Sequence, residues 1–454
     1  MQCCWQRKSV FVLILLCAIW LLPFSRAHCS APVTDSGMTE SGYWIAKLPT
    51  PDAIVMSEKQ IHSYNRAIQK AIPETVVDLQ RYPRVVDKKT LTRYVTTAVL
   101  PKDTVYQNDK PVGVELINDL RMQINLSGIK DSNPVQYGYT VKRANVRTFP
   151  MDKGFFAAPG DREFDIFQET AVDPASPVVI LHQSLRKDWL FVQTGNYRGW
   201  LPAEAVAIAA TQKQWLDYMN LPSYLVVTGS RLQIPGNSRA DRPLIFEMGA
   251  KLPLAQVNGR EAANTGYCVL LPVRNQDGKL AFRNCSVPDN ADVHTGYLPY
   301  TTANVIRQAF KFYGQPYGWG GLHNDVDCSS LVMNVYRSFG VLLPRNADQQ
   351  EVAVGKILRF KTTDYASRAK EILWLQPGAT LHMDGHVMLY LGKDKDRYYV
   401  IHALGSYGDT GQPNGDGTLG RAEAMKVVVS DLDLQRRNGK TFLEELTVGK
   451  NIVL

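Results

Sequence analysis

The chain has 454 residues, of which 45% are hydrophobic and 21% are charged. These values fit a globular protein, and a chain of this length is too long for one small core, so we expect several domains. The net charge of +8 is modest and gives no reason to expect a nucleic-acid partner, although a mild basic excess does not hinder approach to an anionic cell wall.

Residues 1–27 have the pattern of a secretion signal, in which Arg7 and Lys8 precede an apolar stretch at 9–24. This stretch is short for a membrane span, so we expect an exported protein, periplasmic or in the cell envelope, with no transmembrane span in the mature chain. Cleavage would remove three basic residues and no acidic ones, which lowers the net charge from +8 to +5. The alternative is a lipid anchor on Cys29, which the preceding Arg-Ala-His sequence disfavours.

The remaining sequence divides into four parts. Residues 28–136 combine helical periodicity, as at 57–71, with proline-punctuated segments, and predict a helical N-terminal domain. Short strands and close turns then fill 137–207 and, more loosely, 208–300, which predicts two small β domains; one larger β domain is the alternative. From 301 to 454 helices come first and strands later, an order that predicts an α+β domain.

Two cysteines flank a predicted hairpin in the second β region. A four-residue loop at 275–278 would pair Arg274 with Lys279 and place Cys268 opposite Cys285. Directly opposed residues are close enough for a disulfide bond, and an exported protein can retain one. Two free buried thiols are the alternative.

A third cysteine, Cys328, lies where a glycine-rich loop at 314–321 leads into the apolar-periodic run 331–339. The first amides of a helix have no intrahelical partners, and the helix dipole is positive there. We therefore expect a thiol pKa lowered toward neutrality, which suits a catalytic nucleophile.

Two histidines follow on strand-like segments, and cysteine before histidine is the order of a papain-like active site. A hairpin loop at 392–396 would set His386 directly opposite His402, so that His386 accepts the thiol proton and His402 orients its ring. His382 is the alternative base, but only His386 has His402 as a partner on its face. The four-residue step from His382 to His386 suits zinc only on a helix, so we expect neither a metal nor a cofactor.

These motifs together resemble the NlpC/P60 cell-wall cysteine peptidases. The resemblance covers roughly 301–429 and consists, in chain order, of Pro316-Tyr317-Gly318-Trp319-Gly320-Gly321, Asp327-Cys328-Ser329, Leu343-Pro344-Arg345, Gly385-His386-Val387 and Ile401-His402-Ala403. It implies a papain-like α+β catalytic domain. The first β region begins with Asn145-Val146-Arg147 and ends with Gly199-Trp200-Leu201-Pro202, which resembles a bacterial SH3 domain, and 208–300 resembles a second, divergent one.

The whole layout resembles the multidomain γ-D-glutamyl-L-diamino acid endopeptidases of that family. This implies hydrolysis of the bond between D-glutamate and the diamino acid of peptidoglycan stem peptides or muropeptides, through a thioester on Cys328. The amide of Cys328 and the hydroxyl of Tyr317 would stabilise the oxyanion, although Tyr317 has an equal alternative as a packing residue. Asp327 and Ser329 would contact the peptide.

The same resemblance implies that the first SH3 domain walls the cleft and selects a free amino terminus. Glu169 and Tyr197 would then supply a charge partner and a hydroxyl; a solvated acid and a barrel aromatic are the alternatives. Asn346 and Ala347 depart from the family pattern, which bears on the fine substrate preference.

Two other functions use the same features. An amidase or acyltransferase could employ the same cysteine and histidine, because a thioester can pass to water or to another acceptor. A non-catalytic wall-binding protein would use only the SH3-like modules, but binding gives no reason for a cysteine at a helix start.

Overall fold

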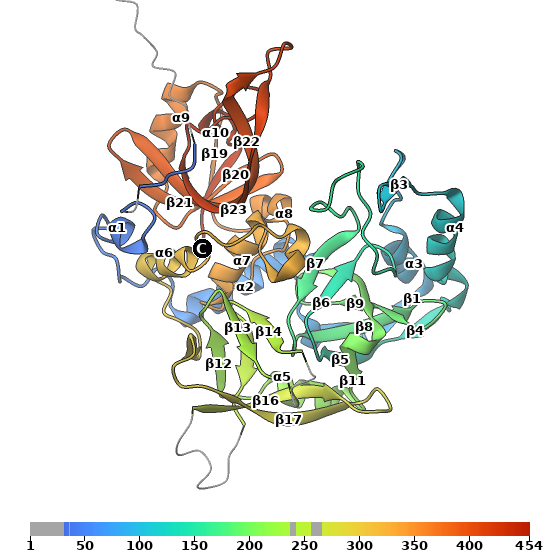
Figure 1. The fold of residues 1–454 in the computed structure, drawn as a ribbon. Coiled ribbons are helices and arrows are strands. Elements are labelled where there is room, and N and C mark those ends of the chain that lie inside the picture. Colours follow the sequence, from blue (N-terminus) through green and yellow to red (C-terminus); the bar gives the residue numbers. More distant parts are fainter. Residues whose placement is uncertain (1–30, 36, 237–241, 256–265) are drawn as a thin grey trace, which may run out of the picture.

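The computed structural model describes residues 31–35, 37–236, 242–255 and 266–454. The predicted signal segment 1–27 and Cys29 lie outside these residues. No helix in the described part of the chain is long and apolar enough to cross a membrane. A C-terminal α+β region, orange to red in Figure 1, lies beside two β-rich regions in green and yellow.

The first β-rich region is a seven-stranded antiparallel sheet in the order β11-β5-β8-β9-β10-β6-β7. Trp200 and Val192 are fully buried in it. A long loop joins β6 to β7 and carries Phe164. The strands are β5 (Gln136–Thr140), β6 (Ala144–Arg147), β7 (Gln168–Val172), β8 (Pro177–Gln183), β9 (Trp189–Gln193), β10 (Arg198–Pro202) and β11 (Val206–Ile208).

The N-terminal region contributes to two different cores. Its first helices, α1 (Ser41–Ile45) and α2 (Glu58–Ala71), pack with the C-terminal region, where Trp44 contacts Tyr399 at 5.2 Å between ring centroids. The later elements pack with the first β region instead. The structure thus divides the described residues between 31 and 136 between two cores, whereas the sequence suggested one helical domain over 28–136. The later elements are η1 (Leu79–Arg81), β1 (Val85–Asp87), α3 (Lys88–Thr96), β2 (Tyr106–Gln107), β3 (Lys110–Pro111), α4 (Val114–Gln123), η2 (Leu126–Gly128) and β4 (Ser132–Pro134).

The second β-rich region has small sheets around a core of its own, which includes Leu225, Phe246 and Val287. This core favours two separate β domains, and both that division and the identity of a second SH3-like barrel stay predictions. Ahead of this region come η3 (Ala203–Ala205) and α5 (Gln212–Met219), and its strands are β12 (Tyr224–Val227), β13 (Arg231–Ile234), β14 (Leu244–Glu247), β15 (Lys251–Pro253), β16 (Tyr267–Arg274), β17 (Leu280–Val287) and β18 (Val293–Thr295).

The cysteine hairpin β16–β17 differs from its predicted register by one residue. Arg274 pairs with Leu280, not with Lys279, because the loop holds one residue more than predicted. Cys285 therefore lies opposite Val269, and Cys268 lies opposite the next residue along the other strand. A shift of one residue turns a side chain to the other face of a sheet, so the two thiols point apart and both are free.

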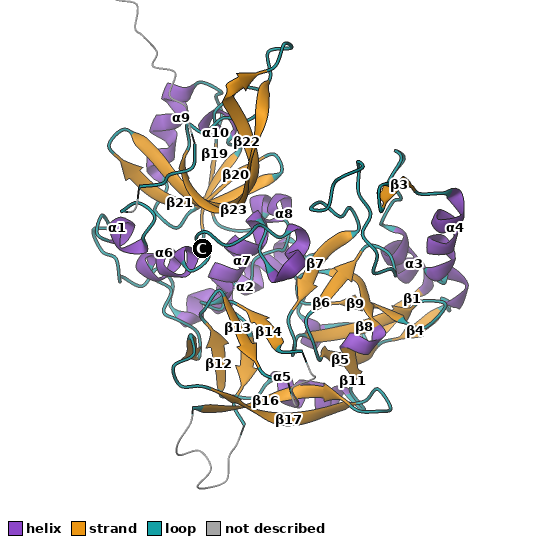
Figure 2. Cartoon of the chain, viewed as in Figure 1, coloured by secondary structure: helices purple, strands orange, loops and turns teal. Residues whose placement is uncertain are grey.

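The C-terminal region has helices first and an antiparallel sheet afterwards, as the sequence predicted. The sheet order is β19-β24-β20-β21-β22-β23. One face packs against α6 and α7, and the other packs against α10 (Figure 2). Ile372 of η5 belongs to the core on this second face. The elements are α6 (Thr302–Phe310), η4 (Trp319–Asn324), α7 (Cys328–Arg337), α8 (Ala347–Val352), β19 (Lys356–Arg359), α9 (Tyr365–Glu371), η5 (Ile372–Trp374), β20 (Thr380–Met383), β21 (His386–Asp394), β22 (Arg397–Pro413), β23 (Leu419–Asp431), α10 (Phe442–Glu445) and β24 (Val448–Asn451).

Candidate active site

Cys328 is the first residue of α7, as the sequence predicted. Asp327 caps this helix: its Oδ1 accepts a hydrogen bond of 2.8 Å from the backbone N–H of Ser330. The Ser330 hydroxyl in turn accepts from the backbone N–H of Asp327 at 2.9 Å. This reciprocal pair satisfies two groups at the helix start and fixes the position of the cysteine between them.

The thiol of Cys328 is buried, with 7% of the residue exposed. Burial, and then the nearby carboxylate of Asp327, raise its pKa to about 12. Backbone hydrogen bonds from Val387 and Ser329 act in the opposite direction, as does the charge of Arg345, but they are smaller effects. The expected shift toward neutrality is therefore wrong for this resting site, because loss of water around the thiolate outweighs the helix dipole.

A buried ion pair holds the loop before the nucleophile. Arg345 donates to both carboxylate oxygens of Asp327, at 3.1 and 2.6 Å, and to the Ser329 hydroxyl at 2.8 Å. Asp327 also accepts from the backbone N–H of Gly320 at 3.0 Å. The side chains of Asp327 and Ser329 are thus hydrogen-bonded to each other and to Arg345. Their contact with a peptide stays a prediction. The sequence placed Arg345 in a motif but gave it no role.

The two histidines are hydrogen-bonded to each other, through Nε2 of His386 and Nδ1 of His402, at 2.7 Å. The prediction that they lie directly opposite each other is wrong. The strands β21 and β22 are joined by two residues only, and β21 has a bulge at Leu391. Leu389 pairs with Ile401, so the register differs by two residues from the predicted one. A two-residue shift keeps side chains on the same face, and the imidazoles still meet.

The histidine pair is enclosed by the sheet and by α10. Nε2 of His402 is 3.0 Å from the Ser430 hydroxyl, and the Phe442 ring packs edge-on against both imidazoles. Burial, followed by the charge of Arg436, lowers the pKa of His386 to about 3, and burial lowers that of His402 well below its usual value. Both rings are therefore neutral at pH 7. Ser430 was missed, although a serine directly after three valines on β23 was its signal.

The Cys328 thiol contacts the sheet at Val387, the residue that follows His386. Helix α7 packs against β21, and one of the two backbone hydrogen bonds to the Cys328 sulfur comes from Val387. Among the described residues no hydrogen bond joins this sulfur directly to an imidazole. Nδ1 of His386 is the ring nitrogen that His402 does not occupy.

The alternative base, His382, belongs to the core. It lies on β20, is 1% exposed, and its Nε2 is 2.9 Å from the Thr380 hydroxyl. Its cross-strand partner is Val387. The structure therefore gives His402 as a partner to His386 and not to His382.

Tyr317 lies beside the nucleophile. Its pKa is raised by burial and then by the proximity of Cys328. Its backbone N–H donates to the carbonyl of Met425 at 3.0 Å, and its ring is 6.1 Å from that of Phe164 in the first β region. The position agrees with either predicted role, oxyanion contact or packing.

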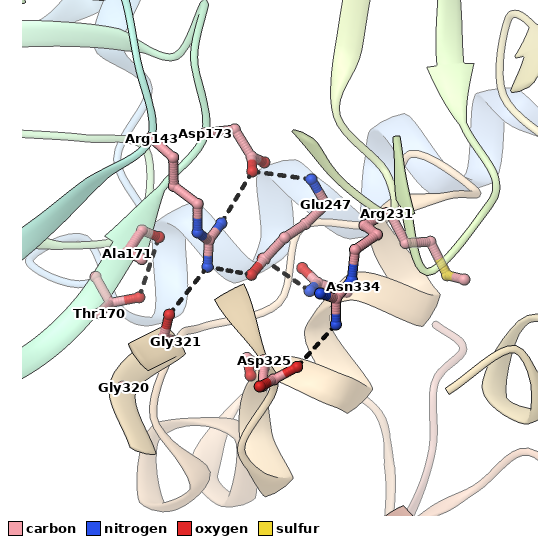
Figure 3. Close-up of polar contacts among 12 residues, drawn as sticks. Arg143, Thr170, Ala171, Asp173, Arg231, Glu247, Gly320, Gly321, Asp325 and Asn334 are labelled. Atoms are coloured by element: carbon pink, nitrogen blue, oxygen red, sulfur yellow. Dashed lines mark hydrogen bonds and ion pairs between the residues drawn. The ribbon is translucent and has the colours of Figure 1, made fainter. Parts of the chain in front are cut away.

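The first β region forms a wall next to the glycine-rich loop. Gln168 on β7 donates to the carbonyl of Gly320 at 2.8 Å. Arg143 donates to the carbonyl of Gly321 at 3.3 Å and also contacts Glu247 of the second β region, as Figure 3 shows. These contacts join three regions of the molecule around the loop that precedes Cys328.

Glu169 and Tyr197 are brought together on that wall. The Tyr197 hydroxyl donates to one carboxylate oxygen of Glu169, and the Thr148 hydroxyl donates to the other at 2.5 Å. Among the described residues no basic group lies within 4 Å of the Glu169 carboxylate, and Glu169 lines a cavity of about 240 Å³ that Arg147 and Arg198 also line. The cavity is also lined by Gln349 of α8 and by Glu74 of the N-terminal region.

Comparison with known families agrees with this architecture. Residues 154–202 match the model of an SH3 domain of the SH3b1 type, and residues 314–413 match the NlpC/P60 family. The C-terminal region is an NlpC/P60 domain. The family resemblance expected from the sequence is confirmed.

Several known proteins share parts of this chain. The bifunctional muramidase/DL-endopeptidase CwlT of Bacillus subtilis is 41% identical over 61 residues, which are 13% of this chain and 18% of the relative. The γ-D-glutamyl-L-lysine dipeptidyl-peptidase of Bacillus cereus is 26% identical over 171 residues, or 36% of this chain and 46% of the relative. The chain thus aligns with less than half of either relative's length.

One solved structure matches nearly the whole length of this chain. An NlpC/P60 endopeptidase from Photobacterium damselae subsp. piscicida superposes with a TM-score of 0.71, covering 91% of this chain and 96% of that one. At 18% identity this likeness shows a shared fold.

Proposed function

We propose that the protein is an exported cell-wall cysteine endopeptidase that hydrolyses the bond between D-glutamate and the diamino acid of peptidoglycan stem peptides. The observation that carries the proposal is the placement of Cys328 at the start of α7, against the strand on which His386 is hydrogen-bonded to His402. A nucleophile, a base and an orienting residue are the parts that such chemistry needs.

In the proposed reaction Sγ of Cys328 attacks the γ-carbonyl carbon of D-glutamate, and its proton passes to Nδ1 of His386. The imidazolium then protonates the leaving amine of the diamino acid as the C–N bond breaks, and a thioester remains. Water, deprotonated by His386, hydrolyses the thioester and restores the thiol. Proton transfer requires Nδ1 to come within hydrogen-bond range of the sulfur, and such contacts often tighten only when substrate binds.

One tautomer arrangement leaves Nδ1 of His386 free to act. In it Nε2–H of His386 donates to Nδ1 of His402, and Nε2–H of His402 donates to Ser430. His402 then fixes the ring and stabilises the imidazolium. The backbone N–H of Cys328 and the Tyr317 hydroxyl would stabilise the oxyanion, and Asp327 and Ser329 would position the peptide mainly through the loop that they hold.

The amine end of the substrate would lie against the first SH3 domain. Glu169 is a carboxylate without a basic partner within 4 Å among the described residues, which suits the ammonium group of a terminal L-alanine. A series of contacts joins this strand to the residue before the nucleophile: the neighbouring Thr170 hydroxyl accepts from Nε of Arg345 at 2.7 Å, and Arg345 binds Asp327.

The decisive experiment uses L-Ala-γ-D-Glu-meso-diaminopimelate and its N-acetylated analogue, with products identified by mass spectrometry. We expect release of L-Ala-D-Glu from the free peptide, much slower cleavage of the acetylated one, and no turnover by Cys328→Ala. Cleavage at another bond, or transfer to an added amine, would assign an amidase or acyltransferase instead. Activity that survives in Cys328→Ala would refute cysteine catalysis.

A further inference from the structure

A basic turn lies beside the histidine pair and has no part in the mechanism above. It follows β23 and is closed by a bridge between Gln435 and Thr441 and by a hydrogen bond of 2.9 Å from the Arg436 N–H to the Lys440 carbonyl. The next residue, Phe442, packs against both imidazoles. The turn is therefore held in a fixed position next to the active site.

Arg436 is the residue of this turn that reaches the catalytic strand. Its Nη1 donates to the backbone carbonyl of Asp384 at 2.9 Å. Asp384 belongs to the two-residue turn between β20 and β21, directly before His386. Arg436 also lies close enough for its charge to act on His386, where its effect is second only to burial.

The guanidinium of Arg436 has no acidic partner in the part of the chain that the structure describes. Among the described residues no carboxylate lies within 4 Å of it, whereas Lys440 in the same turn pairs with Glu445 at 3.5 Å and Arg345 pairs with Asp327. Arg436 is only partly buried, so an anion can approach it. A planar guanidinium binds carboxylates in bidentate fashion and is the side chain best suited to recognise one.

The expected anion follows from the reaction, so this inference rests on the proposed function. His386 must protonate the leaving amine, and the diamino acid that carries this amine therefore lies next to His386 and to Arg436. Diaminopimelate differs from lysine by one additional carboxylate at the far end of its side chain. We propose that Arg436 binds this carboxylate and makes the enzyme selective for stem peptides with diaminopimelate over those with lysine.

The test compares kcat/KM for L-Ala-γ-D-Glu-meso-diaminopimelate and L-Ala-γ-D-Glu-L-Lys. The wild-type protein is expected to favour the diaminopimelate peptide by about tenfold or more, as for a charge-assisted hydrogen bond. In Arg436→Gln the ratio should fall to near unity. The neighbouring Arg437 is the matched control, since it is exposed and its Nε donates to the Leu419 carbonyl. Arg437→Gln should keep the wild-type ratio.

The ratio separates recognition from effects on His386, because both peptides use the same base and any change in its pKa cancels. If Arg436→Gln does not fold, Arg436→Lys serves instead and should give an intermediate ratio, since an ammonium keeps the charge but not the bidentate geometry. Equal rates on both peptides in the wild type, or a preference that survives in Arg436→Gln, would overturn the inference and leave the proposed function standing. Hydrolysis of neither peptide would overturn the proposed function itself.

Discussion

Two antiparallel hairpins of this protein each carry a pair of reactive side chains, and only one pair meets. In β16–β17 the side chains of Cys268 and Cys285 are one residue out of register, lie on opposite faces and remain free thiols. In β21–β22 His386 and His402 are two residues out of register and share one face, and Nε2 of His386 is 2.7 Å from Nδ1 of His402. The difference shows that a register shift of an odd number of residues places two side chains on opposite faces of a hairpin, whereas a shift of an even number keeps them on the same face.

The two hairpins differ for a local reason. The loop of β16–β17 holds one residue more than a four-residue loop, and nothing along the strands compensates for it. The hairpin β21–β22 has a short turn at 395–396, where Lys395 has a φ of 52°, and a bulge at Leu391 restores the alternation needed at its far end. Bulges are a common way to aim a side chain next to an active site.

The largest expected effect comes from removing the base in the histidine hairpin. His386→Ala should lower kcat on the diaminopimelate peptide by about 10³-fold, the usual scale for loss of general acid–base catalysis. His382→Ala is the matched control. Because His382 is buried in the core, its replacement should lower the melting temperature and leave a folded protein active at moderate temperature. The opposite pattern of activities would make His382 the base.

A smaller effect is expected from the other member of the pair. His402→Ala should lower kcat roughly 100-fold, because it removes the group that orients His386 and supports its charge. His402→Asn should recover most of this loss, since an amide oxygen can accept the hydrogen bond from Nε2 of His386. Equal losses in both variants, measured on proteins with the same melting temperature, would contradict an orienting role.

Much of the site could be predicted from the sequence, because its parts depend on local pattern. The position of Cys328 follows from a glycine-rich loop and an apolar-periodic run, and the shared face of the histidines follows from strand alternation. The thiol pKa could not be predicted, since it depends on burial by the distant β21. The division of the N-terminal region between two cores was likewise hidden, because its helices have similar apolar faces whichever neighbour they meet.

The protonation states of Cys328 and His386 in the resting site lead to a further prediction. Burial raises the pKa of Cys328 to about 12 and lowers that of His386 to about 3, so thiol and imidazole are both neutral between these values. Only the thiolate is alkylated, and its fraction grows about tenfold per pH unit below the pKa. Iodoacetamide should therefore modify Cys328 faster with each step from pH 6 to 9, as followed by peptide mapping. A plateau across this range would instead indicate a thiolate–imidazolium pair.

The smallest effect is expected at the cysteine hairpin, where the thiols do not meet. Alkylation of the denatured protein without reductant should modify both Cys268 and Cys285, as seen by mass spectrometry of their peptides. The double variant Cys268→Ala/Cys285→Ala should keep wild-type kcat/KM, and reductant should not change the melting temperature of the wild type. A linked peptide containing both residues would mean that this hairpin slides by one residue in solution, because only a directly opposed pair is placed for a bond. In the histidine hairpin any odd shift would turn one imidazole to the other face and remove the contact on which the proposed base depends.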